Sequence, residues 1–164
     1  MSDVFVIMGV SGCGKTTVGQ ALASQINCPF YDGDDFHPPE NVAKMSHGIP
    51  LNDADRAPWL ARLAALIERH LVEGETAVLA CSALKKRYRD QLRVSDRVRF
   101  IYLEGSFDLI WQRMRARPNH YMKADMLHSQ FEALEPPAAN EAATISIDQD
   151  VDTIVAQILQ IARG

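Results

Sequence analysis

The sequence predicts an α/β fold in which helices cover both faces of a parallel sheet. Short apolar runs alternate with helical patterns throughout the 164-residue chain, as in parallel strands joined by right-handed helical crossovers. A glycine-rich turn separates the first apolar run from the first helical pattern. Only the segments 33–58 and 117–126 are rich in loop-forming residues, and neither has the composition of a linker. We therefore expect one domain over residues 1–164.

The expected elements follow in a regular order. Strands are predicted at 3–8, 29–32, 76–81, 98–103 and 143–148, and helices at 15–26, 39–46, 55–72, 83–93, 106–117, 124–134 and 151–162. Ser82 and Ser106 stand where helix N-caps are expected. Because the strands are parallel, bound ligands should lie at their carboxyl ends.

A phosphate loop joins the first predicted strand to the first helix. Residues 9–16 match the pattern Gly-x4-Gly-Lys-Ser/Thr between an apolar run and a helical pattern. Its glycines permit positive φ angles, which turn backbone N–H groups into a nest for phosphate oxygens, and the helix N-terminus adds its dipole. Lys15 should reach the β and γ phosphates, and the Thr16 hydroxyl should bind Mg²⁺. The residues expected to contact ATP here are Gly9, Val10, Ser11, Gly12, Cys13, Gly14, Lys15, Thr16 and Thr17.

The helix predicted at 55–72 has the clearest periodicity. Leu60, Leu63 and Ile67 fall on one apolar stripe, which indicates a helix that packs against the sheet. Gly74 should end this helix. The apolar run that follows predicts a strand buried on both faces.

Carboxylates follow the end of the second predicted strand. Asp32, Asp34 and Asp35 precede His37 and two prolines, and in an extended chain Asp32 and Asp34 point to one side and Asp35 to the other. Such a pair beside a nucleotide can hold Mg²⁺ and accept the proton of an attacking hydroxyl. We expect Asp32 and Asp34 to be catalytic; the alternative is a solvated acidic turn. His37 fits substrate contact and a turn histidine bonded to the backbone equally well.

Basic side chains could hold an acidic substrate and the triphosphate. Arg56, near the start of the long helix, and Lys85, after the third strand, are candidates for binding a carboxylate, although a solvent-facing Arg56 is equally possible. Arg113 and Arg117 are four residues apart and should share a helix face. They could stack on adenine and bridge the transferring phosphate beneath a lid at about 117–126. The alternative is a charged surface helix.

Composition excludes several classes of protein. A formal charge of −4 and a pI near 5.7 indicate no nucleic-acid surface, and the N-terminal apolar run is too short for a membrane span or a signal peptide. Cys13, Cys28 and Cys81 lack metal-binding spacing, and their odd number suggests free thiols in the cytoplasm. The chain lacks the Asn-Lys-x-Asp and Asp-x-x-Gly motifs of regulatory GTPases.

The blocks 9–16, 32–38, 50–60, 81–93 and 119–122 together closely resemble the bacterial gluconokinases. This resemblance covers nearly the whole chain, and only the phosphate loop is common to other small P-loop kinases. It implies ATP-dependent phosphorylation of the 6-hydroxyl of D-gluconate to 6-phosphogluconate, within sugar-acid catabolism and the pentose phosphate route. It also implies a three-layer P-loop fold similar to adenylate and shikimate kinases, with a five-stranded sheet in the order 2-3-1-4-5, a lid and a homodimer.

The same resemblance implies roles for individual residues. Matched to the motif positions, these are Lys15 and Thr16 for phosphate and Mg²⁺, Asp32 and Asp34 for metal and hydroxyl activation, Arg56 and Lys85 for the sugar acid, and Arg113 and Arg117 for adenine and the lid. The third strand ends in Cys81-Ser82, without the acidic residue that many phosphate-loop NTPases use to hold Mg²⁺. Asp32 is the candidate to supply that charge, and which of Asp32 and Asp34 is the base stays open.

Two other functions are compatible with the fold and the phosphate loop. A shikimate kinase or a nucleoside monophosphate kinase would share the sheet, the loop and the lid, and fold alone does not separate them. A nucleotide-binding module without catalysis is the second alternative, although the acidic pair and the lid arginines favour an enzyme.

Overall fold

The computed structural model describes residues 2–117 and 124–163. One parallel sheet has the strand order β2-β3-β1-β4-β5, with β1 (Val4–Met8), β2 (Phe30–Asp32), β3 (Ala77–Ala80), β4 (Val98–Glu104) and β5 (Ala142–Ser146). The described helical segments are α1 (Lys15–Ile26), the 3₁₀ turn η1 (Gly33–Phe36), α2 (Pro39–Ser46), α3 (Asp53–Glu73), α4 (Lys86–Leu92), α5 (Phe107–Ala116), α6 (Ala124–Ala133) and α7 (Val151–Arg163). The expected order 2-3-1-4-5 is confirmed.

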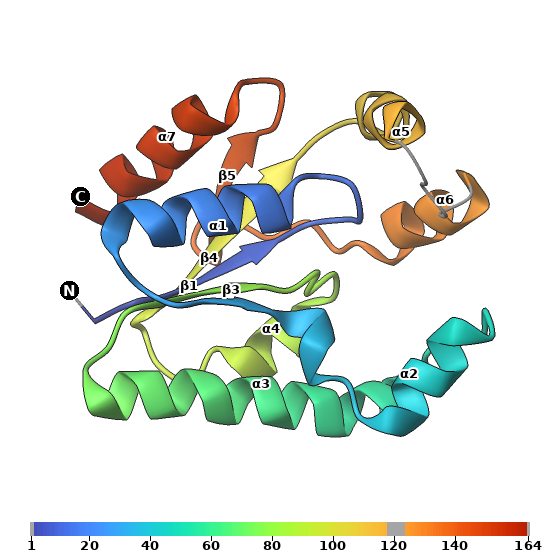
Figure 1. The fold of residues 1–164 in the computed structure, drawn as a ribbon, viewed down its shortest axis with the longest axis horizontal. Coiled ribbons are helices and arrows are strands. Elements are labelled where there is room, and N and C mark those ends of the chain that lie inside the picture. Colours follow the sequence, from blue (N-terminus) through green and yellow to red (C-terminus); the bar gives the residue numbers. More distant parts are fainter. Residues whose placement is uncertain (1, 118–123, 164) are drawn as a thin grey trace.

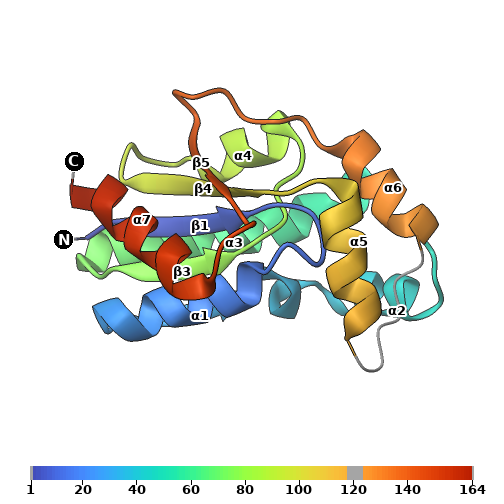
Figure 2. The same ribbon diagram turned by 90° about the horizontal axis from the view of Figure 1, so that it is seen from above.

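Helices cover both faces of the sheet (Figure 1). Helices α1 and α7 lie on one face, and α3 and α4 lie on the other. Figure 2 shows α5 and α6 together at the end of the sheet to which the strands point. None of the helices described in 2–117 and 124–163 is long and apolar enough to cross a membrane.

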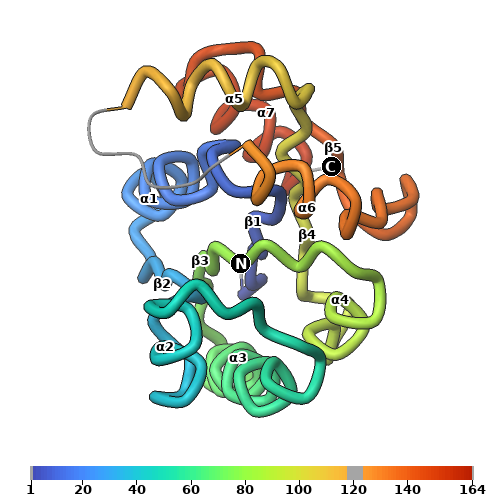
Figure 3. The backbone as a smooth tube through the Cα atoms, turned by 90° about the vertical axis from the view of Figure 1, so that its right-hand side faces the viewer, coloured from blue at the N-terminus to red at the C-terminus, as the bar shows by residue number. Residues whose placement is uncertain are grey.

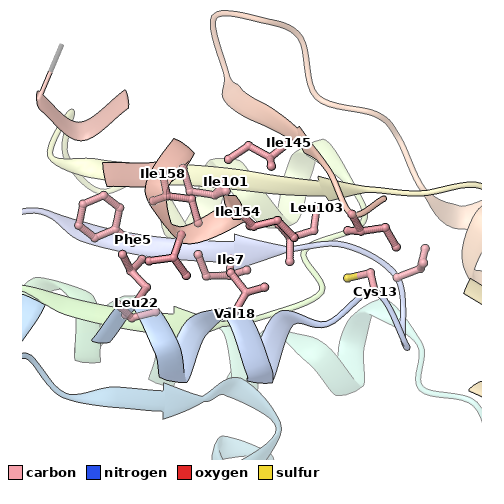
Figure 4. Close-up of a cluster of buried hydrophobic side chains, with 14 of the residues drawn as sticks. Phe5, Ile7, Cys13, Val18, Leu22, Ile101, Leu103, Ile145, Ile154 and Ile158 are labelled. Carbon is pink, nitrogen blue, oxygen red and sulfur yellow. The ribbon is translucent and has the colours of Figure 1, made fainter. Parts of the chain in front are cut away.

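The central strand β1 is buried on both faces, as its uninterrupted apolar run predicts. Phe5 and Ile7 pack with Leu22 of α1 in one core cluster (Figure 4), whereas Val4 and Val6 face the cluster beneath α3. Each of these side chains is at most 1% exposed, and burying one stabilises the fold by about 1.5–3 kcal/mol. The strand is therefore a firm support for the turn that follows it.

Helix α3 begins earlier than its apolar pattern predicts. The Asp55 N–H donates to the Asn52 side chain at 2.8 Å, and the Asn52 N–H donates to the Asp55 carboxylate at 3.0 Å. This capping box satisfies two backbone donors, so the helix starts at Asp53 instead of residue 55. Gly74 ends it with a φ of 69°, as predicted.

The helix predicted at 83–93 begins only at Lys86, so the expected N-cap role of Ser82 is wrong. The Ser82 carbonyl accepts a hydrogen bond from the Gly9 N–H at 3.2 Å, and Ala83 takes a positive φ of 45°. These tertiary contacts keep the chain non-helical until Lys85. Ser106, in contrast, caps its helix as expected, accepting from the Leu109 N–H at 3.2 Å.

Candidate active site

The phosphate loop has the backbone that its glycines predict. Gly9, Gly12 and Gly14 have φ angles of 148°, 82° and 99°, which other L-residues rarely adopt. Space is limited as well, because a Cβ on Gly12 would lie 2.6 Å from Cγ of Met114 in α5. Glycine is therefore required at position 12 for both conformation and packing.

The apolar side chains of the phosphate loop are buried in the core, which leaves its backbone to face a ligand. Val10 and Cys13 are 3% and 2% exposed, so any phosphate contact from them must come from the main chain. Burial raises the pKa of the Cys13 thiol and raises that of Cys81 to about 12. These two cysteines are free and buried, which indicates packing residues and not nucleophiles.

Two side chains lie against the phosphate loop. The Lys15 ammonium donates to the carbonyls of Gly9 and Val10 at 3.0 and 3.1 Å. The Ser11 N–H donates to Oε1 of Gln130 at 2.7 Å, and the Gln130 amide donates to the Ser11 hydroxyl at 2.9 Å. Gln130 belongs to α6, which Figure 3 shows over the end of the sheet. Sequence reasoning missed this residue.

Thr16 and Asp32, the two residues predicted to hold the metal, line one cavity of about 400 Å³. Asp35 lines it too, although an extended chain would have pointed it away from Asp32. The difference arises because residues 33–36 form a 3₁₀ turn, in which the Asp34 N–H donates to the Asp32 carboxylate at 3.0 Å. The prediction of an extended acidic segment is therefore wrong, and Asp32 caps the turn.

Asp34 stands at the open edge of the site. Its side chain is 84% exposed, yet nearby protein and the charge of Asp32 raise the pKa of its carboxyl, opposed by Lys15 and His37. A carboxylate with a raised pKa is a stronger base, and its exposure leaves it accessible to a substrate hydroxyl.

The imidazole of His37 is held in one orientation. It stacks on Trp59 at 4.3 Å between ring centroids, and Nδ2 of Asn41 lies 3.2 Å from its Nδ1. That same Asn41 nitrogen donates to the Asp55 carbonyl at 2.8 Å. It is therefore the amide NH₂, and His37 Nδ1 must accept.

The proton of His37 is consequently on Nε2, which lies 3.9 Å from Oδ1 of Asp34. Burial lowers the pKa of His37, an effect that Arg56 reinforces and Asp34 opposes. A neutral ring with an N–H donor near Asp34 is suited to a hydrogen bond with a substrate hydroxyl. The ring thus bonds to a side chain rather than to the backbone, and it lies next to the carboxylate expected to be catalytic.

The wall behind these residues is also fixed by hydrogen bonding. Trp59 is 4% exposed, and its indole N–H donates to the Gly33 carbonyl at 2.7 Å. Gly33 itself has no room for a side chain, since a Cβ would lie 2.7 Å from the Ala80 carbonyl oxygen. The 3₁₀ turn that carries Asp34 is therefore clamped between α3 and the end of β3.

Three cations surround one aromatic ring. The charged groups of Arg56, Lys85 and Arg87 lie 5.6, 5.9 and 5.5 Å from the centroid of the Tyr88 ring. The Arg56 guanidinium also donates to the Tyr88 hydroxyl at 3.3 Å, and that hydroxyl donates to Asp53. The structure thus brings together Arg56 and Lys85, which the sequence placed on separate helices.

Asp53 balances part of this positive charge. The Tyr88 hydroxyl and then Arg87 hold the pKa of the Asp53 carboxyl below its usual range. Arg87 also forms an ion pair with Asp53. With Arg87 paired in this way, Arg56 and Lys85 are the cations best suited to bind a carboxylate from solution.

The two arginines expected at the lid have different surroundings. Arg113 in α5 donates to the Ile147 carbonyl at 2.7 Å, which ties it to the segment after β5. Arg117 follows the last residue of α5 with an extended backbone, so the expected shared helix face is wrong because the helix ends at Ala116. The charge of Arg117 lowers the pKa of Cys13, against the larger effect of burial. The rest of the predicted lid, 118–123, and the block 119–122 lie outside the described residues.

The residues that sequence reasoning missed differ in the signal they left. Trp59 and Tyr88 lie within blocks that carried the family resemblance, so their presence there was a usable signal. Asn41 and Gln130 belong to no recognised motif, and only the folded chain brings them to the site.

The chain is similar to a shikimate kinase family model and to gluconokinases. The shikimate kinase family model matches residues 11–163. The thermosensitive gluconokinase of Escherichia coli (strain K12) is 46% identical over 161 residues, covering 96% of this chain and 86% of that protein. The gluconokinase of Gluconobacter oxydans (strain 621H) is 43% identical over 157 residues, covering 94% and 88%.

Solved structures agree with these relatives. The crystal structure of a gluconokinase from Sinorhizobium meliloti 1021 has a TM-score of 0.88 at 43% identity, covering 99% of this chain and 93% of that one. A shikimate kinase from Bacteroides thetaiotaomicron has a TM-score of 0.70 at 19% identity, covering 99% of both chains. At that identity the second likeness supports the fold alone.

Proposed function

The chain belongs to the gluconokinase family, and from this premise we propose that it transfers the γ-phosphate of ATP to the 6-hydroxyl of D-gluconate, giving 6-phosphogluconate and ADP. The observation that carries the proposal is the identity of 46% with a bacterial gluconokinase over 96% of this chain. The site supports it, because a phosphate nest, exposed carboxylates and a pair of cations meet at the same end of the sheet.

The phosphate loop supplies the nucleotide end of the reaction. Its backbone N–H groups and the N-terminus of α1 would bind the phosphate oxygens of ATP. Lys15 would leave the loop carbonyls and neutralise charge on the β and γ phosphates. Arg117 is proposed to stabilise the transferring phosphate and Arg113 to contact the adenine side.

Asp34 is the proposed base. Its raised pKa and exposure suit proton acceptance, whereas Asp32 is engaged in capping the turn. The 6-hydroxyl oxygen attacks the γ-phosphorus in line, the bond from phosphorus to the β–γ bridging oxygen breaks, and ADP leaves with the bonding electrons. The hydroxyl proton passes to the Asp34 carboxylate.

The chain also offers oxygen donors that fit Mg²⁺. Thr16 and Asp32 line the same cavity, and Asp35 adds a second carboxylate. The described residues contain no cluster of three or more His, Cys, Asp or Glu side chains suited to a complete metal cage. Mg²⁺ typically binds through one or two carboxylates together with phosphates and water, so Thr16 and Asp32 would hold it. When bound, the ion supplies positive charge that offsets the phosphate oxygens.

The sugar acid is proposed to bind opposite the triphosphate. Arg56 and Lys85 would bind the carboxylate of gluconate, since the positive charges of both lie at the Tyr88 ring, Arg56 from α3 and Lys85 from the residue before α4. His37 would donate from Nε2 to a hydroxyl near the reacting end. Binding the substrate at both its carboxylate end and its hydroxyl end would select a sugar acid over a neutral sugar.

Three broader features stay proposals of the same assignment. Free cysteines support a cytoplasmic location. A role in sugar-acid catabolism and the pentose phosphate route follows from the product. A homodimer is proposed from the family resemblance, and the molar mass in solution, measured by light scattering, tests it.

A coupled ADP-release assay tests the function. Purified protein with ATP and Mg²⁺ is expected to turn over gluconate much faster than shikimate, AMP or CMP. Turnover of shikimate in preference to gluconate would support the alternative, which has less support because the relatives at 46% and 43% identity are gluconokinases, whereas the shikimate kinase structure is 19% identical. Nucleotide binding without turnover of any acceptor would favour a non-catalytic module.

A further inference from the structure

Helix α6 and the residues that follow it contact the phosphate loop at one point and the chain around Lys85 at another. At the nucleotide side, the Gln130 amide makes two reciprocal hydrogen bonds with Ser11, one to its N–H and one to its hydroxyl. These bonds join residues 119 positions apart in the chain. These two bonds hold Ser11, and with it the phosphate loop, in one conformation. Because the Gln130 amide is neutral, it does so without adding a charge to the site.

The other end of the same segment holds the chain around Lys85. The Lys86 N–H donates to the Glu135 carboxylate at 2.9 Å, and the Glu135 N–H donates to the Leu84 carbonyl at 2.7 Å. Buried Arg89 adds a bond to the Glu135 carbonyl at 2.8 Å. Lys85 therefore stands between two residues that are both bonded to Glu135.

The connection between these two anchors is short and packed. Gln130 to Ala133 complete α6; with a rise of about 1.5 Å per helical residue and at most about 3.6 Å for each of the two residues that follow, the two anchors lie within about 12 Å along the chain. Phe131 packs against the core cluster beneath α1, and Leu134 contacts both core clusters. The segment is thus supported on the sheet as well as at its ends.

We propose that residues 130–135, which we name the brace, set the distance between the phosphate loop and the acid-binding Lys85, and that Gln130 is a positioning residue for phosphoryl transfer. The inference rests on the proposed function, which puts ATP at the loop and gluconate at Lys85. In-line transfer needs the reacting atoms about 3–3.5 Å apart, and a misplacement of about 1 Å can cost roughly a hundredfold in rate. A brace of this kind acts on alignment and not on the affinity of either substrate.

The test separates alignment from binding. Gln130→Leu keeps the side-chain volume and removes both bonds to Ser11. Ser129→Ala is the control, because that exposed hydroxyl donates to the Asp125 carbonyl within α6 and bonds to no other group in 2–117 and 124–163. We expect Gln130→Leu to lower kcat by at least about tenfold while the Kd values of gluconate and of a nonhydrolysable ATP analogue, measured by calorimetry, stay within about threefold. Ser129→Ala should match the wild type.

A second variant tests the other end. Glu135→Ala removes the acceptor for the Lys86 N–H, and it should also lower kcat with little change in either Kd. If the brace is one unit, the double variant loses little more than the larger single loss. Fully additive losses would overturn the brace. Glu135→Ala also carries the test if Gln130→Leu does not fold.

Other outcomes overturn the role of Gln130. If Gln130→Leu weakens the Kd of one substrate by as much as it lowers kcat/KM, Gln130 binds that substrate directly. If its kcat stays within about twofold of the wild type, alignment does not depend on Gln130. Wild-type protein that binds both ligands yet leaves gluconate unphosphorylated would instead refute the proposed function.

Discussion

Replacing Asp34 and then Asp32 by asparagine identifies which of the two carboxylates is the catalytic base. Asp34→Asn preserves the shape of the side chain and removes its ability to take a proton. That side chain is 84% exposed, and Nε2 of His37 lies 3.9 Å from its Oδ1. We therefore expect the free energy of unfolding to change by less than about 0.5 kcal/mol, while kcat falls by roughly 10²–10⁴-fold, the contribution typical of a general base.

The pH profile gives an independent signature. Because the pKa of Asp34 is raised, kcat/KM of the wild type should increase with pH as this carboxyl ionises, above the usual range of an aspartate. Asp34→Asn should lose this rise of kcat/KM at acidic pH, which we call the acidic limb, and should still bind the ATP analogue. Initial rates from the coupled assay between pH 4.5 and 8 provide the measurement.

Asp32→Asn is the matched comparison. Its amide oxygen can still accept from the Asp34 N–H, so the capped turn should persist. The loss of charge should raise the Mg²⁺ concentration needed for half-maximal activity. The rise of kcat/KM with pH should persist but move to lower pH, because the charge of Asp32 no longer raises the pKa of Asp34. The assignment is wrong if Asp34→Asn turns over gluconate within a few-fold of the wild type, or if Asp32→Asn is the variant that loses the limb.

Two further predictions concern the acid site and stability. Tyr88→Phe removes the hydroxyl that bonds Arg56 and Asp53, so KM for gluconate should rise about three- to tenfold, the loss expected for one hydrogen bond, with KM for ATP unchanged; an equal rise in both would contradict this. His70 is 3% exposed and lies 2.9 Å from the Tyr31 hydroxyl, and burial lowers its pKa. The unfolded chain therefore binds more protons below about pH 6.5, and the free energy of unfolding should fall with decreasing pH by up to about 1.4 kcal/mol per pH unit. Urea titrations from pH 7.5 to 5 should show a shallower fall for His70→Gln, and an unchanged slope would exclude His70 as the cause.

Sequence patterns predicted the fold and the phosphate loop well because both depend on short-range chemistry. Alternating apolar runs and helical periods predicted every strand and every long helix, within a few residues at the ends. The conformation of the loop follows from Gly9, Gly12 and Gly14, whose φ angles need no distant partner. Caps were harder: Ser106 was identified correctly, whereas Ser82 was not, since its carbonyl bonds to Gly9.

The acidic segment shows where local reasoning stops. The alternation of side chains in an extended chain predicted Asp32 and Asp34 on one side. In the structure, Gly33 packs against the Ala80 carbonyl and accepts a hydrogen bond from Trp59. These contacts accompany a 3₁₀ turn in place of the extended chain. The carboxylates do follow the end of β2, as predicted. Their directions depended on what packs behind them, and that brought Asp35 to the cavity with Asp32.

By itself, the sequence determined the kind of chemistry: a glycine nest for phosphates, carboxylates at a strand end, and cations for an acid. Only the tertiary structure decided which of these groups meet, such as Arg56 and Lys85 at the ring of Tyr88. It also brought Gln130 to Ser11 across 119 positions of chain. The physical reason is that a backbone turn is encoded by its own residues, whereas a contact between distant side chains exists only after the sheet and its helices have packed.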